Sequence, residues 1–458
     1  MTGGDEPLPP RPGLFWLPTS SDVKVPGIYR VGKDGGVEVD LLGRLAGGPE
    51  LEMAVVQADV EGDPVTLFTC HRRTSRGAGQ KGQAPALVTW WVGSAIENAH
   101  LTKEDDARFD RLGFTSPHLR WWAERDIVKW DYKVEDDGQV TNSYSWPQDQ
   151  PETAVVPGAT IELRTLVGHQ DVAFGDKTIM QRQAFSVSSD VPLPYDELWT
   201  RYVRPLAELI SLAAGERTDI EVLWTRLSSE ISARIHSGCR IRRHNGRSVP
   251  EPDHGLEMLW TLPDWNFADG VARWFAIDEK APAATVLFEL AQDEGSGWAT
   301  DRFFNAVSAA EALHRGLYGT AEPTDRQKQR LEAIYAQVTS DQRKWLRWKP
   351  RHSHEPTLQD RLAELVKDTG HPAWRFIPDA ASWSSAIVKA RNDLAHGREE
   401  ATNVLRDPAR VHAMTETLIA VLALRLMREL GFTEERTSEL TLHQMRYWGN
   451  LGQLLRAS

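Results

Sequence analysis

The stretch Trp383-Ser-Ser-Ala-Ile-Val-Lys-Ala-Arg-Asn-Asp-Leu-Ala-His396-Gly397 decides how the second half of this chain folds. Four of its apolar residues recur with the spacing i, i+4, i+7 and i+11, which marks one face of an amphipathic helix: Trp383, Ile387, Ala390 and Leu394. Pro378-Asp379 supplies a start signal and Gly397 a stop signal. The pattern therefore predicts a helix over 380–396.

Three polar residues near the end of this helix lie away from its apolar face. At about 100° per residue, Asn392 and His396 stand one above the other, and Arg391 lies on the flank. We expect His396 to point away from its own bundle, where the negative end of the helix favours a protonated imidazole. A guanidinium that holds phosphate and an imidazole that moves a proton suit metal-free phosphodiester cleavage; the alternative is an idle surface histidine.

These residues resemble the signature of the HEPN ribonucleases, which is Arg, a polar residue, three further positions and then His. Arg391-Asn392-xxx-His396 fits it without departure. The resemblance extends over nearly the whole chain to ApeA-like anti-phage proteins, which join a β-rich N-terminal domain to a C-terminal HEPN domain. The matching stretches are residues 25–27, 37–43, 109–122, 303–315 and 357–362.

The resemblance implies a metal-independent endoribonuclease whose site forms where the signature helices of two protomers meet. The RNA 2′-hydroxyl would attack the adjacent phosphate and leave a 2′,3′-cyclic phosphate. Arg391 would stabilise the developing charge, His396 would act as general acid or base, and Asn392 would orient it. Asp393 and Glu311 are weaker supporting candidates, and an ion pair is the simpler role for Glu311. The implied setting is abortive infection, with RNA as substrate, a homodimer or higher oligomer, and a phage-derived trigger at the N-terminal domain.

Two other functions stay open at this point. A catalytically silent HEPN dimer could serve as a scaffold or binding module, although Arg391 and His396 are both present. Alternatively, the front of the chain could bind a small ligand or sugar while the bundle only dimerises. The charge distribution bears on both: residues 301–458 carry 23 Lys+Arg against 20 Asp+Glu, which leaves 30 against 45 for residues 1–300. An acidic N-terminal part followed by a mildly basic C-terminal part suits a sensing or restraining domain that precedes an RNA-cutting domain.

The fold class that these patterns and the resemblance indicate is α+β, with an N-terminal antiparallel β-rich domain followed by a C-terminal all-α HEPN bundle. Residues 1–13 are rich in Gly and Pro and are predicted to be disordered. The β-rich domain is expected over 14–192, a mixed α/β connecting region over 193–295 and the bundle over 296–458. Bundle helices are predicted over 299–317, 324–339, 356–368, 380–396 and 407–430.

The amino-acid composition limits which cellular compartment and which cofactors we expect for this chain. No stretch approaches the ~20 apolar residues that a membrane span needs, and no signal peptide is apparent. Cys70 and Cys239 are too few for a disulfide framework or a cysteine zinc site, so we expect a reduced cytoplasm and no metal or cofactor. No phosphate-loop, zincin, esterase or dinucleotide motif occurs in the sequence.

A basic and aromatic segment precedes the predicted 356–368 helix. Residues 343–352 interleave two tryptophans with five basic residues, which are Arg343, Lys344, Arg347, Lys349 and Arg351. Such a composition suits a groove that grips phosphates and stacks bases, or else a solvated connector whose tryptophans seal the bundle. His352-Ser353-His354 lacks a third ligand nearby and is a weak metal candidate.

Overall fold

The structure is a computed structural model. It describes residues 9–32, 35–45, 52–76, 87–103, 106–134, 140–171, 177–227, 232–237, 258–293, 298–319, 325–340, 342–343, 355–396 and 407–456. Contacts group the chain into two compact units. The β unit comprises Met1–Ile210 and Thr218–Asp269, and the helical unit comprises Ser211–Arg217 and Gly270–Ser458. Residues 193–295 are shared between the two units, and the four-part division expected from the sequence stays a prediction.

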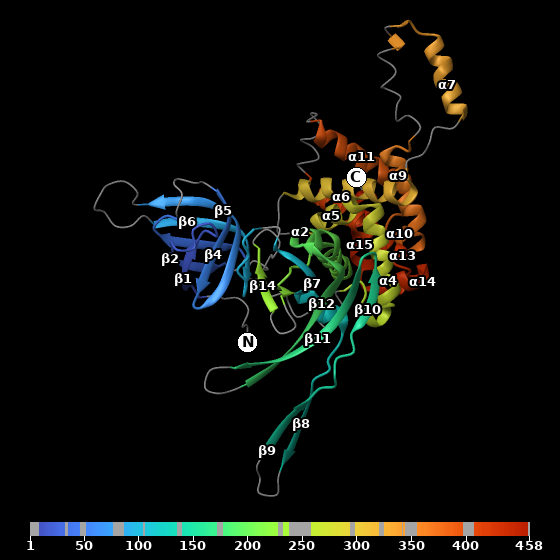
Figure 1. Cartoon of the computed structure of the whole chain (residues 1–458). Coiled ribbons are helices and arrows are strands. Elements are labelled where there is room, and N and C mark those ends of the chain that lie inside the picture. Colours follow the sequence, from blue (N-terminus) through green and yellow to red (C-terminus); the bar gives the residue numbers. More distant parts are fainter. Residues whose placement is uncertain are drawn as a thin grey trace. The chain divides into compact units, whose positions relative to one another are not determined.

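Six strands of the β unit form a closed antiparallel barrel, drawn in blue in Figure 1. They run in the order β6-β3-β2-β1-β4-β5, and pairing of β5 with β6 closes the ring. Their bounds are β1 (Arg11–Trp16), β2 (Val25–Val31), β3 (Val37–Leu42), β4 (Glu52–Val60), β5 (Asp63–Arg76) and β6 (Leu87–Glu97). Alternate residues, such as Val37, Val39 and Leu41 of β3, fill the interior. Closure leaves these strands without an unpaired edge inside the ring.

The beginning of β1 overlaps the end of the segment predicted to be disordered, because residues 11–13 are part of a strand. Arg11 pairs with Tyr29 of β2, and Gly13 pairs with Val60 of β4. Gly and Pro composition indicated a loop, but glycine is needed here because a Cβ at Gly13 would lie 2.7 Å from the carbonyl oxygen of Asp59. Residues 1–8 lie outside the described residues.

The sheet continues beyond the barrel through the end of β6, where Ile96 and Ala95 pair with β14. The order continues β14-β13-β7-β12-β11-β10. The bounds are β7 (Arg108–Thr115), β10 (Glu152–Val156), β11 (Ala159–Asp171), β12 (Lys177–Pro194), β13 (Val222–Arg226) and β14 (Ser232–His236). A separate two-stranded ribbon consists of β8 (Lys129–Val134) and β9 (Val140–Ser145). The N-terminal antiparallel β domain predicted from the sequence is therefore confirmed.

Short helices accompany these strands. The first, α1 (Pro117–Ala123), follows β7 directly, and its Trp122 is buried. Later in the chain come α2 (Tyr195–Leu198), the π-helical η3 (Trp199–Val203), α3 (Arg204–Ala214) and the 3-10 turn η5 (Leu262–Asp264). One π-helical turn thus lies between α2 and α3.

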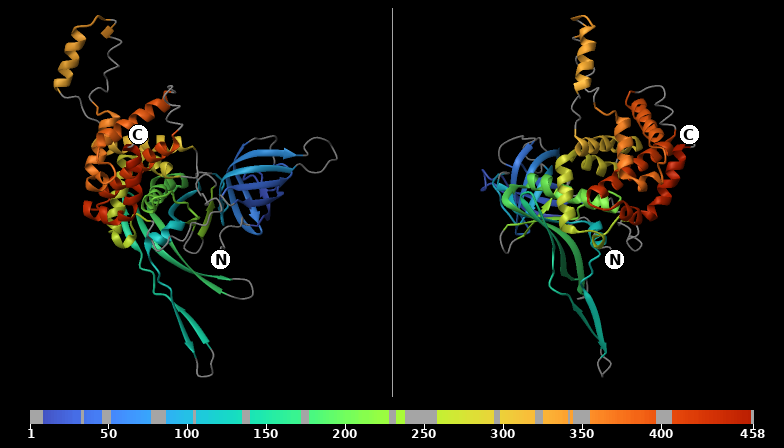
Figure 2. Two further views of the ribbon diagram at one scale, coloured as in Figure 1. Left: turned by 180° about the vertical axis from the view of Figure 1, so that it is seen from behind. Right: turned by 90° about the vertical axis from the view of Figure 1, so that its right-hand side faces the viewer.

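The helical unit confirms the predicted C-terminal bundle, coloured from yellow to red in both views of Figure 2. Its helices are α4 (Phe267–Lys280, which begins in the β unit), α5 (Pro282–Gln292), α6 (Ala299–Tyr318), α7 (Asp325–Ala336), α9 (Leu358–Thr369), α10 (His371–Trp374), α11 (Ala380–Ala395), α13 (Pro408–Glu429), α14 (Glu434–Leu440) and α15 (Leu442–Arg456). Helix α13 contacts α5, α6, α9, α10, α14 and α15, as its apolar circumference predicts.

Candidate active site

The helix that carries the signature begins at a capped residue. The Asp379 carboxylate accepts hydrogen bonds from the backbone N–H of Ala381 at 3.1 Å and of Ser382 at 3.0 Å. The Ser382 hydroxyl donates to the same carboxylate at 2.6 Å, and these bonds hold the pKa of Asp379 below its usual value. A carboxylate at this position satisfies orphan N–H groups of the first turn, so α11 starts where the sequence signal places it.

The apolar face of α11 holds the helix against the bundle. Trp383, Ile387 and Ala390 are buried, and Leu394 is half-buried, which confirms the stripe read from the sequence. The Trp383 indole N–H donates to the Thr417 hydroxyl of α13 at 3.0 Å. Helix α11 also contacts α9 and α6. Packing and this buried hydrogen bond fix the helix along its first three turns.

The far end of α11 is open. His396 is the C-cap residue and is exposed, and its backbone N–H donates to the Asn392 carbonyl oxygen at 3.0 Å. Arg391 and Asn392 are half-buried. The prediction that His396 points away from its own bundle is therefore confirmed. Within the described residues, neither Arg391 nor His396 forms an ion pair with a carboxylate.

The side chain of Asn392 contacts the arginine of the signature. Its Oδ1 atom accepts a hydrogen bond from Arg391 Nη1 at 3.1 Å. The sequence suggested instead that Asn392 orients the His396 ring, and no hydrogen bond between those two side chains occurs in the described part of the chain. Asn392 is therefore a hydrogen-bond partner of Arg391.

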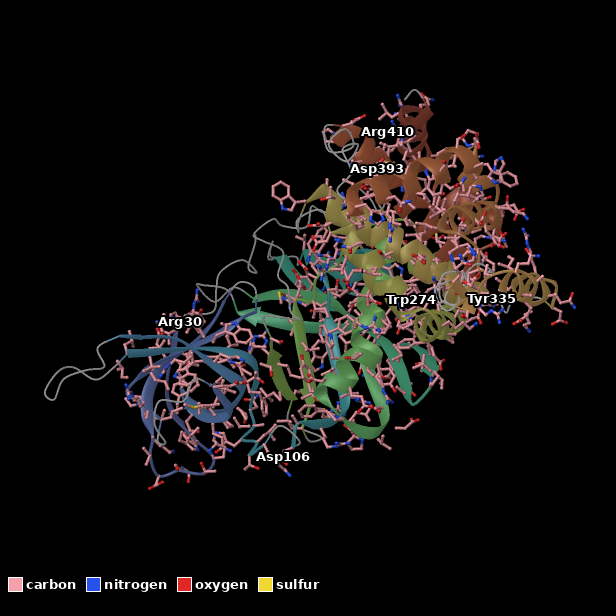
Figure 3. The ribbon with its side chains drawn as sticks, turned by 90° about the horizontal axis from the view of Figure 1, so that it is seen from above. Arg30, Asp106, Trp274, Tyr335, Asp393 and Arg410 are labelled. Carbon is pink, nitrogen blue, oxygen red and sulfur yellow. The ribbon has the colours of Figure 1, made fainter. Side chains whose placement is uncertain are left out.

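The two weaker candidates lie in different surroundings. Asp393, labelled in Figure 3, belongs to α11 and is buried, with 3% of it exposed. Glu311 of α6 accepts a hydrogen bond from Arg315 one turn later at 3.0 Å, which is the ion-pair role that the sequence favoured for it. Asp393 thus lies in the last turn of α11 but is buried, whereas Glu311 is paired with Arg315 on α6.

A buried polar layer joins α6 to α9, and the sequence revealed it only in part. The Arg361 guanidinium, 2% exposed, donates to His314 Nδ1 at 3.2 Å and to the Glu355 carboxylate at 3.0 Å. Because arginine can only donate, His314 Nδ1 accepts, and its Nε2–H donates to Glu364 at 2.8 Å. Glu355 and Glu364 were missed, although Glu364 stands three residues after Arg361 on the same helix face.

The proposed RNA-gripping segment is mostly beyond what the structure describes. Arg343 is exposed, and its backbone N–H donates to the Thr339 carbonyl oxygen at 2.8 Å. Lys344, Arg347, Lys349 and Arg351 lie outside the described residues, as does His352-Ser353-His354. Among the residues that are described, no group of three or more His, Cys, Asp or Glu side chains is arranged to hold a metal ion.

Comparison with known families identifies the class of protein that this fold and site define. The family model for the Apea-like HEPN domain matches residues 304–436, which include α11 and its signature. The model for ApeA N-terminal domain 1 matches residues 11–274, more than half of the chain. The chain belongs to the ApeA-like HEPN family, and that membership points to an anti-phage HEPN effector.

Other comparisons add little to the family assignment. No curated protein and no solved structure matches the chain. HEPN domains are commonly nucleases and typically dimerise, which are properties of the family rather than observations on this chain. In the described part of the chain, no helix has the length and apolarity to cross a membrane.

Proposed function

We propose that this protein is a metal-independent endoribonuclease that acts in anti-phage defence by abortive infection in the cytoplasm. The observation that carries the proposal is the open end of α11, where an exposed imidazole follows a half-buried guanidinium by five residues on a helix that the bundle holds fixed. Both groups are available to a substrate, because neither is neutralised by a carboxylate among the described residues.

Each residue has a distinct role in the proposed reaction. The RNA 2′-hydroxyl attacks the neighbouring phosphorus and the 5′-oxygen leaves, so the products are a 2′,3′-cyclic phosphate and a 5′-hydroxyl. Arg391 stabilises the negative charge that builds on the phosphate oxygens, and Asn392 holds the guanidinium in place. His396 transfers a proton to or from the reacting oxygens.

A second copy would complete the site. One exposed imidazole can serve as base or as acid in a given step, whereas in-line displacement at phosphorus uses both. Two signature helices facing each other would supply two histidines and two arginines, with His396 free to face a partner because it points away from its own bundle. The β unit would sense a phage-derived trigger or restrain the nuclease.

The test is an RNA cleavage assay in excess EDTA, with and without extract from phage-infected cells. Cleavage should persist in EDTA, and His396→Ala should lower its rate about 100- to 10,000-fold, the usual contribution of general acid–base catalysis. His371→Ala is the matched control, because His371 is an exposed histidine of the same unit outside the signature. A substrate with 2′-deoxy sugars should resist cleavage.

The alternative is a catalytically silent HEPN dimer that serves as a scaffold or ligand sensor. Loss of either signature residue would have favoured it, but Arg391 and His396 are both present. Absence of RNA cleavage under every condition, or cleavage that His396→Ala leaves unchanged, would favour this alternative.

A further inference from the structure

Two residues of the α11 signature belong to a longer row of polar side chains. Ser385, Lys389, Asn392 and His396 follow the spacing i, i+4, i+7 and i+11, which places them on one face of the helix labelled α11 in Figure 1. Each stands two residues after a member of the apolar stripe, and two residues turn a helix by about 200°, so the two rows lie on opposite sides. Asn392 is half-buried and the other three are exposed. We call these four residues the polar stripe.

The polar stripe carries no carboxylate, although the chain as a whole has a net charge of −12. Asp393 is the one acidic residue in the sequence of α11, and it is buried. Lys389 is exposed and forms no ion pair within the part of the chain that the structure describes. This side of the helix is therefore positively charged and attracts anions.

Lys389 and His396 are far enough apart to meet different phosphates of one strand. Seven residues separate them, which is about 10.5 Å of helix axis at 1.5 Å per residue. Side chains in a helix lean toward its N-terminus, which takes the Lys389 ammonium group further from the open end of α11. Nucleotides of a stacked strand are about 3.4 Å apart, so this separation corresponds to roughly three nucleotides, and to fewer in an extended strand.

The chemistry of the polar stripe favours a phosphate backbone over a protein surface as its ligand. Protein interfaces are enriched in aromatic residues, Met and Arg, and they are depleted in Lys and Ser. The polar stripe has none of the enriched types and contains Ser385 and Lys389. An ammonium group is a point charge that pairs with phosphate, and such a contact positions a strand without reading its bases.

We propose that Lys389 forms a phosphate subsite and that an RNA strand runs along the polar stripe of α11. This inference rests on the proposed nuclease function and adds a substrate class to it, which is RNA that extends several nucleotides from the cleaved bond. Because Lys389 holds the strand away from that bond, its contact is equal in the ground state and the transition state. It therefore lowers KM and leaves kcat unchanged.

The salt dependence of RNA binding tests the subsite without any cleavage. The full chain carrying His396→Ala is titrated with a labelled oligouridylate of about 12 nucleotides, and the Kd is measured by fluorescence anisotropy between about 50 and 200 mM salt. Each phosphate contact with a single strand contributes about 0.7 to the slope of log Kd against log salt. Adding Lys389→Gln should lower that slope by about 0.7 and weaken binding about two- to fivefold.

Two further variants control for charge and position. Lys389→Arg keeps the positive charge and should keep the salt slope. Lys280→Gln is the matched control, because Lys280 is an exposed lysine of the same unit that lies on α4 and outside the polar stripe. It should bind the oligouridylate as its parent does. Circular dichroism establishes that each variant is folded.

Cleavage kinetics give a second readout in the chain that keeps His396. Lys389→Gln should raise KM for the same oligouridylate about two- to fivefold with kcat unchanged, because a contact made equally in both states affects binding alone. Cleavage of a dinucleotide, which has no phosphate beyond the cleaved bond, should be the same in Lys389→Gln and wild type.

The binding measurements decide the subsite by themselves. An unchanged salt slope in Lys389→Gln overturns the proposal, and so does an equal change in Lys280→Gln or a parent protein that does not bind the oligouridylate. A variant that alters self-association in sedimentation velocity while leaving RNA affinity unchanged would make the polar stripe a subunit contact instead. Absence of cleavage under every condition overturns the proposed nuclease function, whereas the subsite stands or falls on the salt slope.

Discussion

Two histidine regions of the helical unit have opposite environments. In the buried polar layer between α6 and α9, His314 is 1% exposed, and both ring nitrogens have partners, in Arg361 and Glu364. At the open end of α11, His396 is exposed and is held by its backbone N–H, which donates to the Asn392 carbonyl oxygen. One ring is fixed by the protein, whereas the other is presented to solvent.

The difference separates stability from chemistry. A buried histidine whose nitrogens are both occupied cannot exchange a proton with a substrate without breaking the layer that holds it. An exposed histidine at a helix end contributes little to folding and keeps its nitrogens available. Residue type alone therefore does not distinguish a structural histidine from one that is available to a substrate, whereas the partners of its ring do.

The largest expected effect concerns the buried layer. Arg361→Ala removes the buried cation beside the Glu355 carboxylate, whose side chain is 10% exposed, while the exposed Arg315 guanidinium stays 3.4 Å away. Breaking a buried ion pair from one side costs about 3–5 kcal/mol, and because Arg315 remains, the free energy of unfolding should fall by about 3 kcal/mol, the lower end of that range. Urea denaturation measures it, and His396→Ala should change stability by less than about 0.5 kcal/mol. Equal losses of unfolding free energy in the two variants would contradict the distinction between the buried and the exposed histidine regions.

A smaller effect is expected at the open end of α11. Asn392→Ala removes the acceptor of the Arg391 Nη1 hydrogen bond, and a bond to a charged group contributes about 1.5–3 kcal/mol when well formed. Since both residues are half-buried, we expect RNA cleavage to slow about tenfold, with an unchanged pH profile. Asn392→Asp keeps an acceptor oxygen but adds a carboxylate beside the guanidinium, so it should not restore the rate. A shifted pH profile would instead mean that Asn392 acts on His396.

The smallest effect is a pH dependence of the α6–α9 contact. Burial, together with a hydrogen bond to the Asp368 carboxylate, raises the pKa of Tyr318 to about 12 from its ordinary value of 10.0. A raised pKa means that the stabilisation is complete below pH 10 and is lost as the pH rises through about 12. Tyr318 is 39% exposed, so the change should be modest.

Denaturant titrations at several alkaline pH values measure this change. Tyr318→Phe should be less stable than wild type below pH 10 and should lose less stability than wild type between pH 10 and 12. Parallel decline of the two proteins over that range would show that another group controls the alkaline transition.

The helices of the bundle could be read from the sequence because local signals agree with burial. Asp407 caps α13 by accepting from the Arg410 backbone N–H at 3.0 Å, and Gly431 follows its end with a φ of +99°. Helix α15 was missed because glycines lower helix propensity. Gly452 is required there, since a Cβ at that position would lie 2.1 Å from the carbonyl oxygen of Phe376. Only the packed structure explains that glycine.

The sequence indicates that the N-terminal part forms β-strands, but it does not indicate how those strands pair. The sequence predicted an antiparallel β-rich domain, but alternation carries no information on which strand pairs with which. Closure of the barrel depends on pairing between residues far apart in sequence, such as Val37 with Val92 and Gly13 with Val60. The β8–β9 ribbon was also missed, because its polar and aromatic alternation is short and is surrounded by carboxylates.

The sequence by itself determined the family, the β-then-α order and the residue types of the signature, because helix periodicity, caps and motif spacing are local properties of the chain. Tertiary structure decided which polar groups are buried and which are open. It assigned Asn392 to Arg391, placed Asp393 in the interior and engaged His314 on both ring nitrogens. Those assignments depend on neighbours contributed by other helices and on side-chain conformation, which local spacing does not specify.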